Sequence, residues 1–428
     1  MKNTLNSRKG LSTLLQMPGQ FITSWVGKIN SLQISYRLTR SSTPLIIHPE
    51  RVKHFTSLFH SAKKHSNCSP MTQIDEQICS KINEMTVQFN RNNITRTAAY
   101  WEVYRFYPEL QWAFLAHMVS RNGGWSMTDL RGEWLPQLMD NELITSTFEM
   151  LEACNSLIFG DAYPQLCLYV ESQRTKRNLF HLLPHFGVSS FMIPFWNQFW
   201  SDGNAVPLTE ALIINEQHFI QSRVVEDTHF RRNVFDSLSF RSLPLLQLNQ
   251  IVFPIGEVKS TREGNSQRLV GRVLENFTDL QERIEFGKSL YGMLFGYPQV
   301  LKETTLFAES IIHTGSRADY WPQRFRKLRK EKTDGKPDKG DSSAGQSFSS
   351  MWLSPSLSEA WPDQPYKSTK EKDWFHNIEV MSYLRSIRLP RVIDMTHEHL
   401  LSQNKLQTAV LLERSFMKGA SSRRTGRG

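Results

Sequence analysis

The stretch Asn90–Gly124, NRNNITRTAAYWEVYRFYPELQWAFLAHMVSRNGG, determines the fold class. Its first part carries short polar side chains of the kind that cap helices, and we expect Asn93 or Thr95 to be a helix N-cap. Its second part, residues 108–121, is apolar on nearly every side, which is typical of a helix buried among other helices. The glycine pair that follows favours the left-handed turn that ends a helix. The stretch therefore predicts a junction of two helices in an α-helical core.

Helical periodicity extends on both sides of this junction. Apolar residues recur on one helical face at Ile74, Ile78, Ile82, Met85 and Phe89, and again at Leu280, Ile284, Gly287, Tyr291 and Leu294. The best candidate for a strand is Leu245–Phe253, which alternates in part and ends at a proline. We predict a mainly α fold: a large multi-helix domain with short extended segments, a flexible linker and a helical C-terminal extension.

Three Tyr-Pro pairs, at residues 107–108, 163–164 and 297–298, predict helix starts. Proline suits the first helical position because the N–H it lacks would be unpaired there. The residue before a proline is pushed toward extended geometry, so each pair is expected to mark a helix boundary. Similar sequence around the second and third pairs leaves open a degenerate repeat.

Composition divides the chain into five parts. Residues 1–49 form a basic amphipathic arm, in which two short helices are hinged at Pro18-Gly19, and residues 50–330 form the helical core domain. Residues 331–350, rich in Gly, Ser, Lys and Asp, form a flexible linker. Residues 351–417 form an extension with helices near Trp374–Ile387 and His397–Phe416, and residues 418–428 form a disordered basic tail.

The net charge of +10 is unevenly distributed. No Asp or Glu precedes Glu50, whereas six Lys and Arg residues do, and a second basic cluster follows Pro322. This asymmetry favours an acidic protein or an anionic membrane surface as the partner. Nucleic acid is permitted but less favoured, and charged faces that only meet solvent explain the same residues.

Targeting and cysteine patterns indicate a cytoplasmic protein with peripheral membrane contact as an option. No run of about 20 apolar residues predicts a transmembrane segment, and the start lacks the apolar core of a secretory signal. The four cysteines match no disulfide framework, zinc ribbon or CxxC motif. We therefore expect reduced thiols, no bound metal and no other cofactor.

Helix geometry gives the first candidate site residues. A helix that begins near Asn93 places Arg96 and Tyr100 on one face. An arginine with a phenol one turn on, beside the free N–H groups of a helix start, can hold a carboxylate or a phosphate. His117, in the apolar helix that follows, is expected to be a hydrogen-bonded core histidine.

A second set lies on the predicted helix around residues 208–224. Glu216 and Arg223, two turns apart, line its edge, and Asn215 and Gln217 occupy positions that ought to be apolar. Because a buried polar group without a partner costs about 1–3 kcal/mol, we expect these amides to pair with arginines of the junction. Arg317 either clamps an anion or ties down a loop. For all these residues the favoured alternative is a closed structural network.

Four short motifs follow one another in the order typical of one family. They are Asn90-Arg-x-Asn-Ile-Thr-Arg-Thr-x-Ala-Tyr, Asp161-Ala-Tyr-Pro-Gln-Leu, Ile214-Asn-Glu-Gln and Gly315-Ser-Arg-x-Asp-Tyr-Trp-Pro. In these motifs the chain resembles the YppC family of Bacillus-type bacteria, over roughly residues 45–330. The resemblance implies a cytoplasmic, bacterial, helical protein, and it transfers no activity.

Three functions remain open on the sequence. The leading interpretation is a non-enzymatic helical binding or scaffold protein whose basic ends contact an acidic partner or a membrane surface. The second is an enzyme or small-anion-binding domain that uses Asn93, Arg96, Tyr100, Glu216 and Arg223, and the third is a nucleic-acid-associated protein. Geometry separates the first two, because a ligand site requires these side chains to meet at a pocket with unpaired donors.

Overall fold

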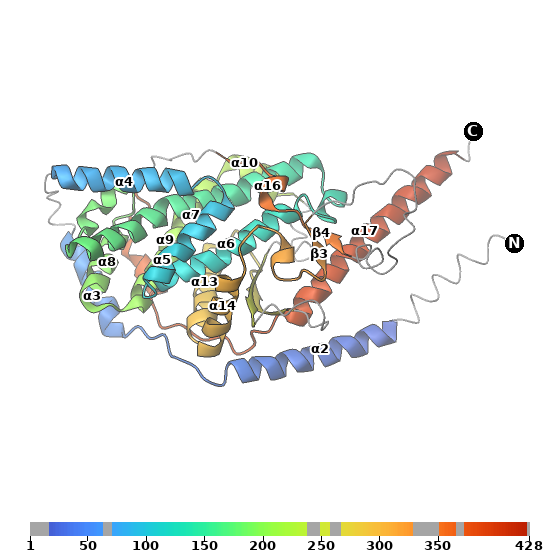
Figure 1. Ribbon diagram of the computed structural model, residues 1–428, viewed down its shortest axis with the longest axis horizontal. Helices are drawn as coiled ribbons and strands as arrows, with labels where there is room; N and C mark the ends of the chain where they lie inside the picture. The colour runs from blue at the N-terminus through green and yellow to red at the C-terminus, as the bar shows by residue number, and fades with distance from the viewer. Residues whose placement is uncertain are drawn as a thin grey trace.

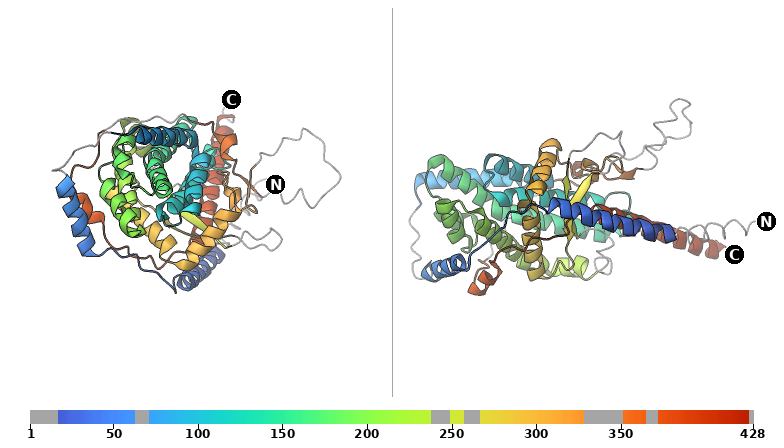
Figure 2. Two further views of the ribbon diagram at one scale, coloured as in Figure 1. Left: turned by 60° about the vertical axis from the view of Figure 1, so that its left-hand side comes forward. Right: turned by 90° about the horizontal axis from the view of Figure 1, so that it is seen from below.

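The predicted mainly α fold is confirmed by a computed structural model, which describes residues 17–62, 71–237, 249–256, 267–327, 351–364 and 372–425. Helices run side by side in an elongated body, and α2 and α17 reach beyond it at the end where both termini lie (Figures 1 and 2). The predicted linker, residues 331–350, falls outside the described residues. No helix in the described ranges combines the length and the hydropathy needed to cross a bilayer.

The N-terminal half of the chain is helical nearly throughout. Its elements, in chain order, are α2 (Met17–Leu38), α3 (Pro49–Ala62), α4 (Gln73–Phe89), α5 (Asn93–Phe106), α6 (Gln111–Asp129), the 3-10 turn η1 (Leu135–Gln137), α7 (Asn141–Thr175), the 3-10 helix η2 (Phe180–Phe186), α8 (Met192–Asp202) and α9 (Ala205–Ile220). The long helix α7 packs against α4, α5, α6 and α9 and is the centre of the body.

The remaining elements are shorter and more varied. They are two π-helical turns, η3 (Gln221–Val225) and η4 (Arg231–Phe235), which flank α10 (Thr228–Phe230); strands β1 (Gln250–Ile255) and β2 (Arg268–Val273); α13 (Leu280–Phe295) and α14 (Pro298–Ser310); η6 (Arg317–Asp319); β3 (Phe325–Arg326) and β4 (Trp352–Leu353); α16 (Leu357–Ala360); η7 (Ile378–Tyr383); and α17 (Thr396–Thr425). The two periodic apolar faces of the sequence correspond to α4 and α13 and confirm both helices.

The cap of α5 differs from the prediction by one residue. Asn92 is the N-cap, and its side chain accepts a hydrogen bond from the backbone N–H of Thr95 at 3.0 Å. The Thr95 hydroxyl in turn accepts from the Asn92 N–H, which completes a capping box. Asn93 lies inside the helix and is fully buried. The expected cap at Asn93 or Thr95 is therefore wrong, although the helix itself is confirmed.

The glycine pair at residues 123–124 does not end α6, which continues to Asp129. Both glycines instead allow close helix packing. A Cβ on Gly123 would lie 3.1 Å from the Asn155 amide oxygen, and a Cβ on Gly124 would overlap the side chains of Asn93 and His313. Tertiary contact therefore explains these glycines, and the predicted left-handed turn is wrong.

The three Tyr-Pro pairs have three different outcomes. Pro298 is the first residue of α14, as predicted. Pro108 lies in the turn between α5 and α6. This pair therefore marks a helix boundary, but α6 begins three residues after Pro108. Pro164 lies within α7, where neighbouring helices on several sides hold the continuous helix together. The second predicted helix start is therefore wrong.

Two small sheets contain the strands of the described residues. β1 and β2 pair antiparallel, with Gln250 opposite Val273 and Ile255 opposite Arg268, and β3 pairs parallel with β4. The strand predicted at residues 245–253 is confirmed from Gln250 onward, and residues 245–248 lie outside the described residues. Pro254 lies inside β1, so the proline does not end the strand.

The segments after residue 350 join the same core as the preceding helices. Trp361 stacks on Phe148 of α7 with ring centroids 3.9 Å apart, and its indole N–H donates to the Met127 carbonyl. The helix predicted near residues 374–387 is wrong, because only the 3-10 helix η7 forms there. The backbone of this segment bonds elsewhere: the N–H of Ile387 donates to the Leu45 carbonyl, and the Ser386 hydroxyl bonds Ile47.

The two terminal helices also differ from the prediction. α2 runs without a break through Pro18-Gly19, where a hinge was expected; proline is tolerated in the first turn of a helix. The helix predicted at residues 397–416 is confirmed as α17, and it continues to Thr425, past the point where a disordered tail was expected. α2 crosses α17 at Gly27, where any Cβ would overlap the His397 imidazole.

Candidate functional site

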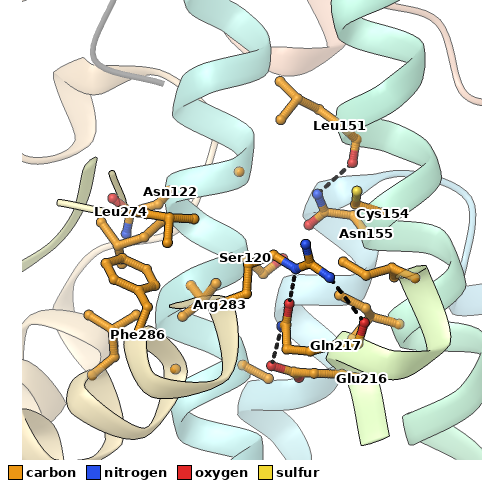
Figure 3. Close-up of a pocket in the computed structure, with 18 of the residues that line it drawn as sticks. Ser120, Asn122, Leu151, Cys154, Asn155, Glu216, Gln217, Leu274, Arg283 and Phe286 are labelled. Carbon is orange, nitrogen blue, oxygen red and sulfur yellow. Dashed lines mark hydrogen bonds between the residues drawn. The ribbon is translucent and has the colours of Figure 1, made fainter. Parts of the chain in front are cut away.

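A cavity of about 220 Å³ lies in the middle of the helical body. Its wall is made by α5, α6, α7, α9 and α13, together with residues next to β1 and β2. Figure 3 shows Asn122, Leu274 and Phe286 at one side and Cys154 and Asn155 of α7 at the other. Most of the wall is apolar, with a few polar groups, as is usual for small-molecule sites.

Helix α5 contributes Arg96 and Tyr100, which line the cavity one turn apart. Arg96 pairs with Glu152 at 2.5 Å and donates to Asn90 at 3.0 Å, but its buried Nε has no hydrogen-bond partner. The buried Tyr100 hydroxyl is also unpaired. Burial, followed by the charge of Glu216, raises the pKa of Tyr100 well above its usual value. Two polar groups of the cavity-lining residues are thus without hydrogen-bond partners within the described part of the chain.

Helix α9 contributes Glu216 and Gln217. Burial raises the pKa of the Glu216 carboxyl to about 8, although hydrogen bonds from Gln217 and Trp112 lower it in part. Glu216 is therefore largely protonated at neutral pH and can donate a hydrogen bond. After Ile220, α9 passes into the π-helical turn η3, a type of irregularity often found at functional sites.

Arg283 of α13 reaches the cavity from the opposite side. Its Nε donates to the Gln217 side-chain oxygen at 2.9 Å (Figure 3). Its Nη1 donates to the Phe277 carbonyl at 2.7 Å, and its Nη2 donates to Gln221. All these acceptors are neutral amide or carbonyl oxygens. Burial lowers the pKa of Arg283, but a guanidinium remains charged near neutral pH. Among the residues that the structure describes, no carboxylate is hydrogen-bonded to this cation at the cavity wall.

Of the predicted site residues, the structure brings Arg96, Tyr100 and Glu216 to this one cavity. Asn93 lies just behind the wall: its amide donates to the Ser120 carbonyl at 2.8 Å, and its oxygen accepts from His313 at 2.9 Å. Ser120 itself lines the cavity. Asn93 therefore positions the wall without facing the cavity.

Arg223 lies in η3 and does not line the cavity. Its guanidinium packs over the Phe219 ring and donates to the Phe219 carbonyl at 2.8 Å. Its positive charge acts on Asp161 of α7, whose pKa burial raises to about 7. The π-helical turn rotates Arg223 away from the face that carries Glu216, so a straight-helix projection misplaced it.

The amides of α9 find partners other than those predicted. Asn215 donates to Asp161 and accepts from the Trp374 indole at 2.9 Å, and Gln217 bonds Arg283 and Glu216. Neither amide is bonded to an arginine of the α5–α6 junction, so that expectation is wrong. The partners come from α7, α13 and the C-terminal segment, whose placement depends on the tertiary fold.

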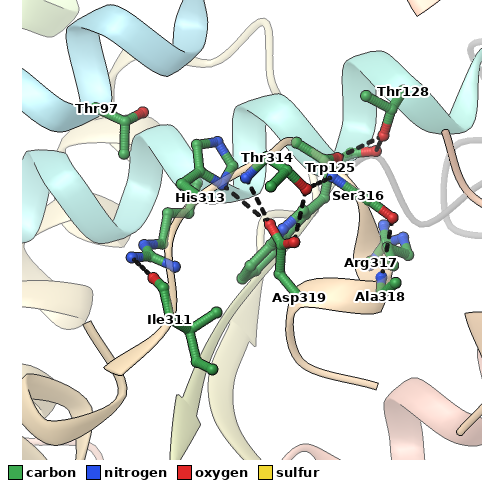
Figure 4. A network of polar contacts seen from close by, with 12 residues as sticks. Thr97, Trp125, Thr128, Ile311, His313, Thr314, Ser316, Arg317, Ala318 and Asp319 are labelled. Atoms are coloured by element: carbon green, nitrogen blue, oxygen red, sulfur yellow. Dashed lines mark hydrogen bonds and ion pairs between the residues drawn. The ribbon is translucent and has the colours of Figure 1, made fainter. Parts of the chain in front are cut away.

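Arg317 belongs to a separate network (Figure 4). Its Nε donates to Asp129 at 2.6 Å, and its Nη1 contacts the Tyr320 hydroxyl and the His399 ring. These contacts join the end of α6, η6 and α17, and they fit the alternative that Arg317 ties down a loop. The structure does not bring Arg317 to the cavity.

His117 is paired at both ring nitrogens, as predicted for a core histidine. Its Nδ1 donates to the Thr97 carbonyl at 2.8 Å, and its Nε2 accepts from Arg121 Nε at 3.0 Å. Burial lowers its pKa well below the usual value, so the ring is neutral. Cys79, Cys154 and Cys167 are free thiols, as expected. Within the described ranges no three His, Cys, Asp or Glu side chains lie close enough to hold a metal ion.

Sequence reasoning missed Arg283 and Asn249. Asn249 lines the cavity beside β1, and its buried amide oxygen has no hydrogen-bond partner. The sequence could have indicated Arg283, because this charged residue lies three residues after Leu280 and four before Gly287, on the apolar face of α13. Asn249 lies within the partly alternating stretch Leu245–Phe253, which predicted a strand but not a cavity-lining amide.

Comparison with known proteins assigns the family. Residues 88–405 match the family described as "Protein of unknown function (DUF2515)". The chain belongs to the DUF2515 family. It is also 34% identical over 347 residues to the Uncharacterized protein YppC of Bacillus subtilis (strain 168), an alignment that spans 81% of this chain and 98% of that protein. The predicted resemblance to the YppC family is confirmed. No solved structure matches the chain.

The DUF2515 region contains the complete cavity wall, from Arg96 to Leu290. It also contains the Arg317 network up to His399. Helix α2 and the last twenty residues of α17 lie outside it. The cavity thus lies within the family region, whereas α2 lies outside it.

Proposed function

We propose that this protein binds a small, mostly apolar molecule with one acidic head group in its central cavity. The observation that carries the proposal is the set of buried, unpaired polar atoms at the wall: Tyr100 Oη, Arg96 Nε and Asn249 Oδ1. More than nine in ten buried polar groups in proteins have a partner. A residue that carries such an atom and lines a cavity is a candidate to bind a polar group of a ligand.

The wall and volume of the cavity limit the ligand. Side chains such as Leu115, Val119 and Phe286 give the wall its apolar character. A dry apolar cavity of about 150 Å³ accommodates benzene, and this cavity measures about 220 Å³. It therefore has room for a body the size of a benzene ring together with a short polar head.

The charges at the wall support an acidic head. Arg96 is neutralised by Glu152, and Glu216 is largely protonated at neutral pH. Arg283 then supplies a positive charge whose hydrogen-bond acceptors are neutral. A carboxylate ligand would accept from Tyr100 and Arg96 and would hold Glu216 in its protonated form. Charge-assisted hydrogen bonds of this kind are the strong ones.

A thermal-shift titration of the full-length protein tests this proposal. Three probes share a phenyl ring and differ in the head: phenylacetate, phenylethanol and phenylethylamine. We expect phenylacetate to raise Tm most, because it alone can accept hydrogen bonds as an anion. The neutral alcohol phenylethanol should raise Tm only slightly, and phenylethylamine should leave Tm unchanged.

Two matched variants locate the site. Tyr100→Phe removes only the hydroxyl and should weaken phenylacetate binding about tenfold or more, as a lost hydrogen bond to a charged group does. Tyr104→Phe is the control, since Tyr104 lies one turn further on α5, is also buried and does not line the cavity. Equal affinities of the two variants, or no response to any probe, would contradict the proposal.

We also propose, as predicted from the sequence, a cytoplasmic location and an acidic partner for the basic residues. The absence of Asp and Glu before Glu50 supports an acidic partner of some kind. An anionic membrane surface, an acidic protein and a nucleic acid all have the required charge. The surface of α2 distinguishes among them.

A further inference from the structure

One face of α2 is held firmly against the body. The Ser35 hydroxyl accepts hydrogen bonds from the backbone N–H groups of Ile393 and Asp394, at 3.1 and 3.0 Å. The Ser31 hydroxyl donates to the Asp394 carboxylate at 2.8 Å, and Leu38 is buried. These contacts fix the rotation of the helix about its own axis.

The opposite face of α2 exposes three large apolar side chains. Ile29, Leu32 and Tyr36 are 51%, 54% and 74% exposed. Their spacing of three and four residues places them on one helical stripe. Figures 1 and 2 show α2 along the outside of the molecule, with one side open to solvent. A stripe of this kind is costly in water unless another surface covers it.

Basic residues border this stripe. Lys28, Arg37 and Arg40 are all exposed, and residues 1–49 contain six Lys and Arg but no Asp or Glu. A nucleic acid would use the positive charge but not the apolar side chains. An anionic lipid surface uses both, because its headgroups attract the cations and its acyl boundary takes up the apolar stripe.

We propose that the α2 stripe, defined as Ile29, Leu32 and Tyr36 with its basic border, docks on an anionic lipid surface. The fixed rotation of α2 presents the stripe outward without any rearrangement of the body. The dock lies outside the DUF2515 region and does not depend on what the cavity binds. It places the protein at the membrane periphery, and no helix of the described residues is long and apolar enough to cross the membrane.

Vesicle flotation of the full-length protein tests the proposal. Vesicles of phosphatidylcholine alone are compared with vesicles that also contain phosphatidylglycerol, and we expect flotation only with the latter. Paired Arg37→Gln and Arg40→Gln substitutions should lower the affinity about thirtyfold, at about fivefold for each basic residue near an anionic surface. Arg105→Gln with Lys302→Gln, two exposed cations on α5 and α14, is the control for net charge.

A second pair of variants tests the apolar part. Ile29→Ser with Leu32→Ser should lower the affinity about tenfold or more, because two partly inserted side chains lose apolar burial. Ile74→Ser with Val87→Ser, two exposed apolar residues of α4, is the matched control and should float like the unmodified chain. An unchanged thermal midpoint verifies that each variant is folded.

Three results would overturn the proposal. The first is no flotation with anionic vesicles. The second is equal flotation of the Ile29/Leu32 variant and the unmodified chain, which would reduce the contact to bulk charge. The third is tight, salt-sensitive binding to RNA that depends on Arg37 and Arg40 in the absence of vesicle binding, which would identify a nucleic-acid partner instead.

Discussion

Replacement of Glu216 by Gln should stabilise the protein, and the gain should grow with pH. In the folded protein the pKa of Glu216 is about 8, against an ordinary value of 4.5. Between these two values the unfolded chain gives up the proton while the folded chain retains it. The folded state therefore loses about 1.4 kcal/mol of stability for each pH unit above the ordinary value. From 4.5 to 7 this amounts to about 3 kcal/mol.

Glutamine keeps the shape of the side chain and cannot ionise. The difference in the free energy of unfolding between Glu216→Gln and the unmodified chain should be close to zero near about pH 4.5 and rise to about 3 kcal/mol at pH 7. Above about pH 8 the difference should level off, because the carboxyl then ionises in both states. Both proteins share the other buried acids, so contributions such as that of Asp161 largely cancel.

Urea unfolding at a series of pH values from about 5 to 8 measures this difference directly. Glu102→Gln, which replaces an exposed glutamate of α5, is the control and should follow the curve of the unmodified chain. A stability difference for Glu216→Gln that is constant over this range would show that the carboxyl is not held protonated in the cavity. A difference in the free energy of unfolding that decreases as the pH rises would show that the pKa of Glu216 is lowered in the folded protein, not raised.

The remaining predictions concern the packing around the site and are tested by the same unfolding measurements. Gly124→Ala should lower the free energy of unfolding by about 2–3 kcal/mol, since the new Cβ overlaps both Asn93 and His313, which share a buried hydrogen bond. Gly123→Ala brings its Cβ against the Asn155 side chain at the cavity edge and should lower the free energy of unfolding by less than about 1 kcal/mol. Asn92→Ala should cost about 1 kcal/mol through loss of the α5 cap. Tyr100→Phe should raise the free energy of unfolding of the ligand-free protein by up to about 1 kcal/mol, because it removes an unpaired buried hydroxyl. Opposite signs in these four cases would contradict the packing described.

Local patterns predicted the helices well where one apolar face continues through the whole element. α4 and α13 follow directly from the recurrence of large apolar residues every three to four positions. The same reasoning failed where a residue serves a tertiary contact. Gly123 and Gly124 suggest a helix end in the sequence, yet they are helical because α7 and the His313 loop approach too closely for a side chain. Nothing within the local sequence contains that information.

The site residues, like the helices, were predictable where local helix geometry alone places them. Arg96 and Tyr100 meet because they share one face of α5, and Glu216 stood out as a charged residue in an apolar helix. Arg223 was misplaced because the backbone changes from α to π geometry between it and Glu216. Arg317 was misplaced because its partners, Asp129 and His399, come from elements far apart in the chain.

The contrast between two buried arginines argues that the cavity is more than a packing defect. Arg317 is held by Asp129 and by the Tyr320 hydroxyl, and it does not line the cavity. Arg283 is equally buried, yet only neutral oxygens receive its hydrogen bonds, and it borders an empty volume. A fold selected for stability alone gains from placing a carboxylate beside such a cation or from filling the space with apolar atoms. The chain instead bonds Arg283 to neutral oxygens, while the charges of Asp279 and Glu226 act on it without a hydrogen bond, and it keeps the Tyr100 hydroxyl and a protonated carboxyl at the same wall. Each of these features lowers the stability of the empty protein, and a bound molecule with an acidic head would offset all of them together.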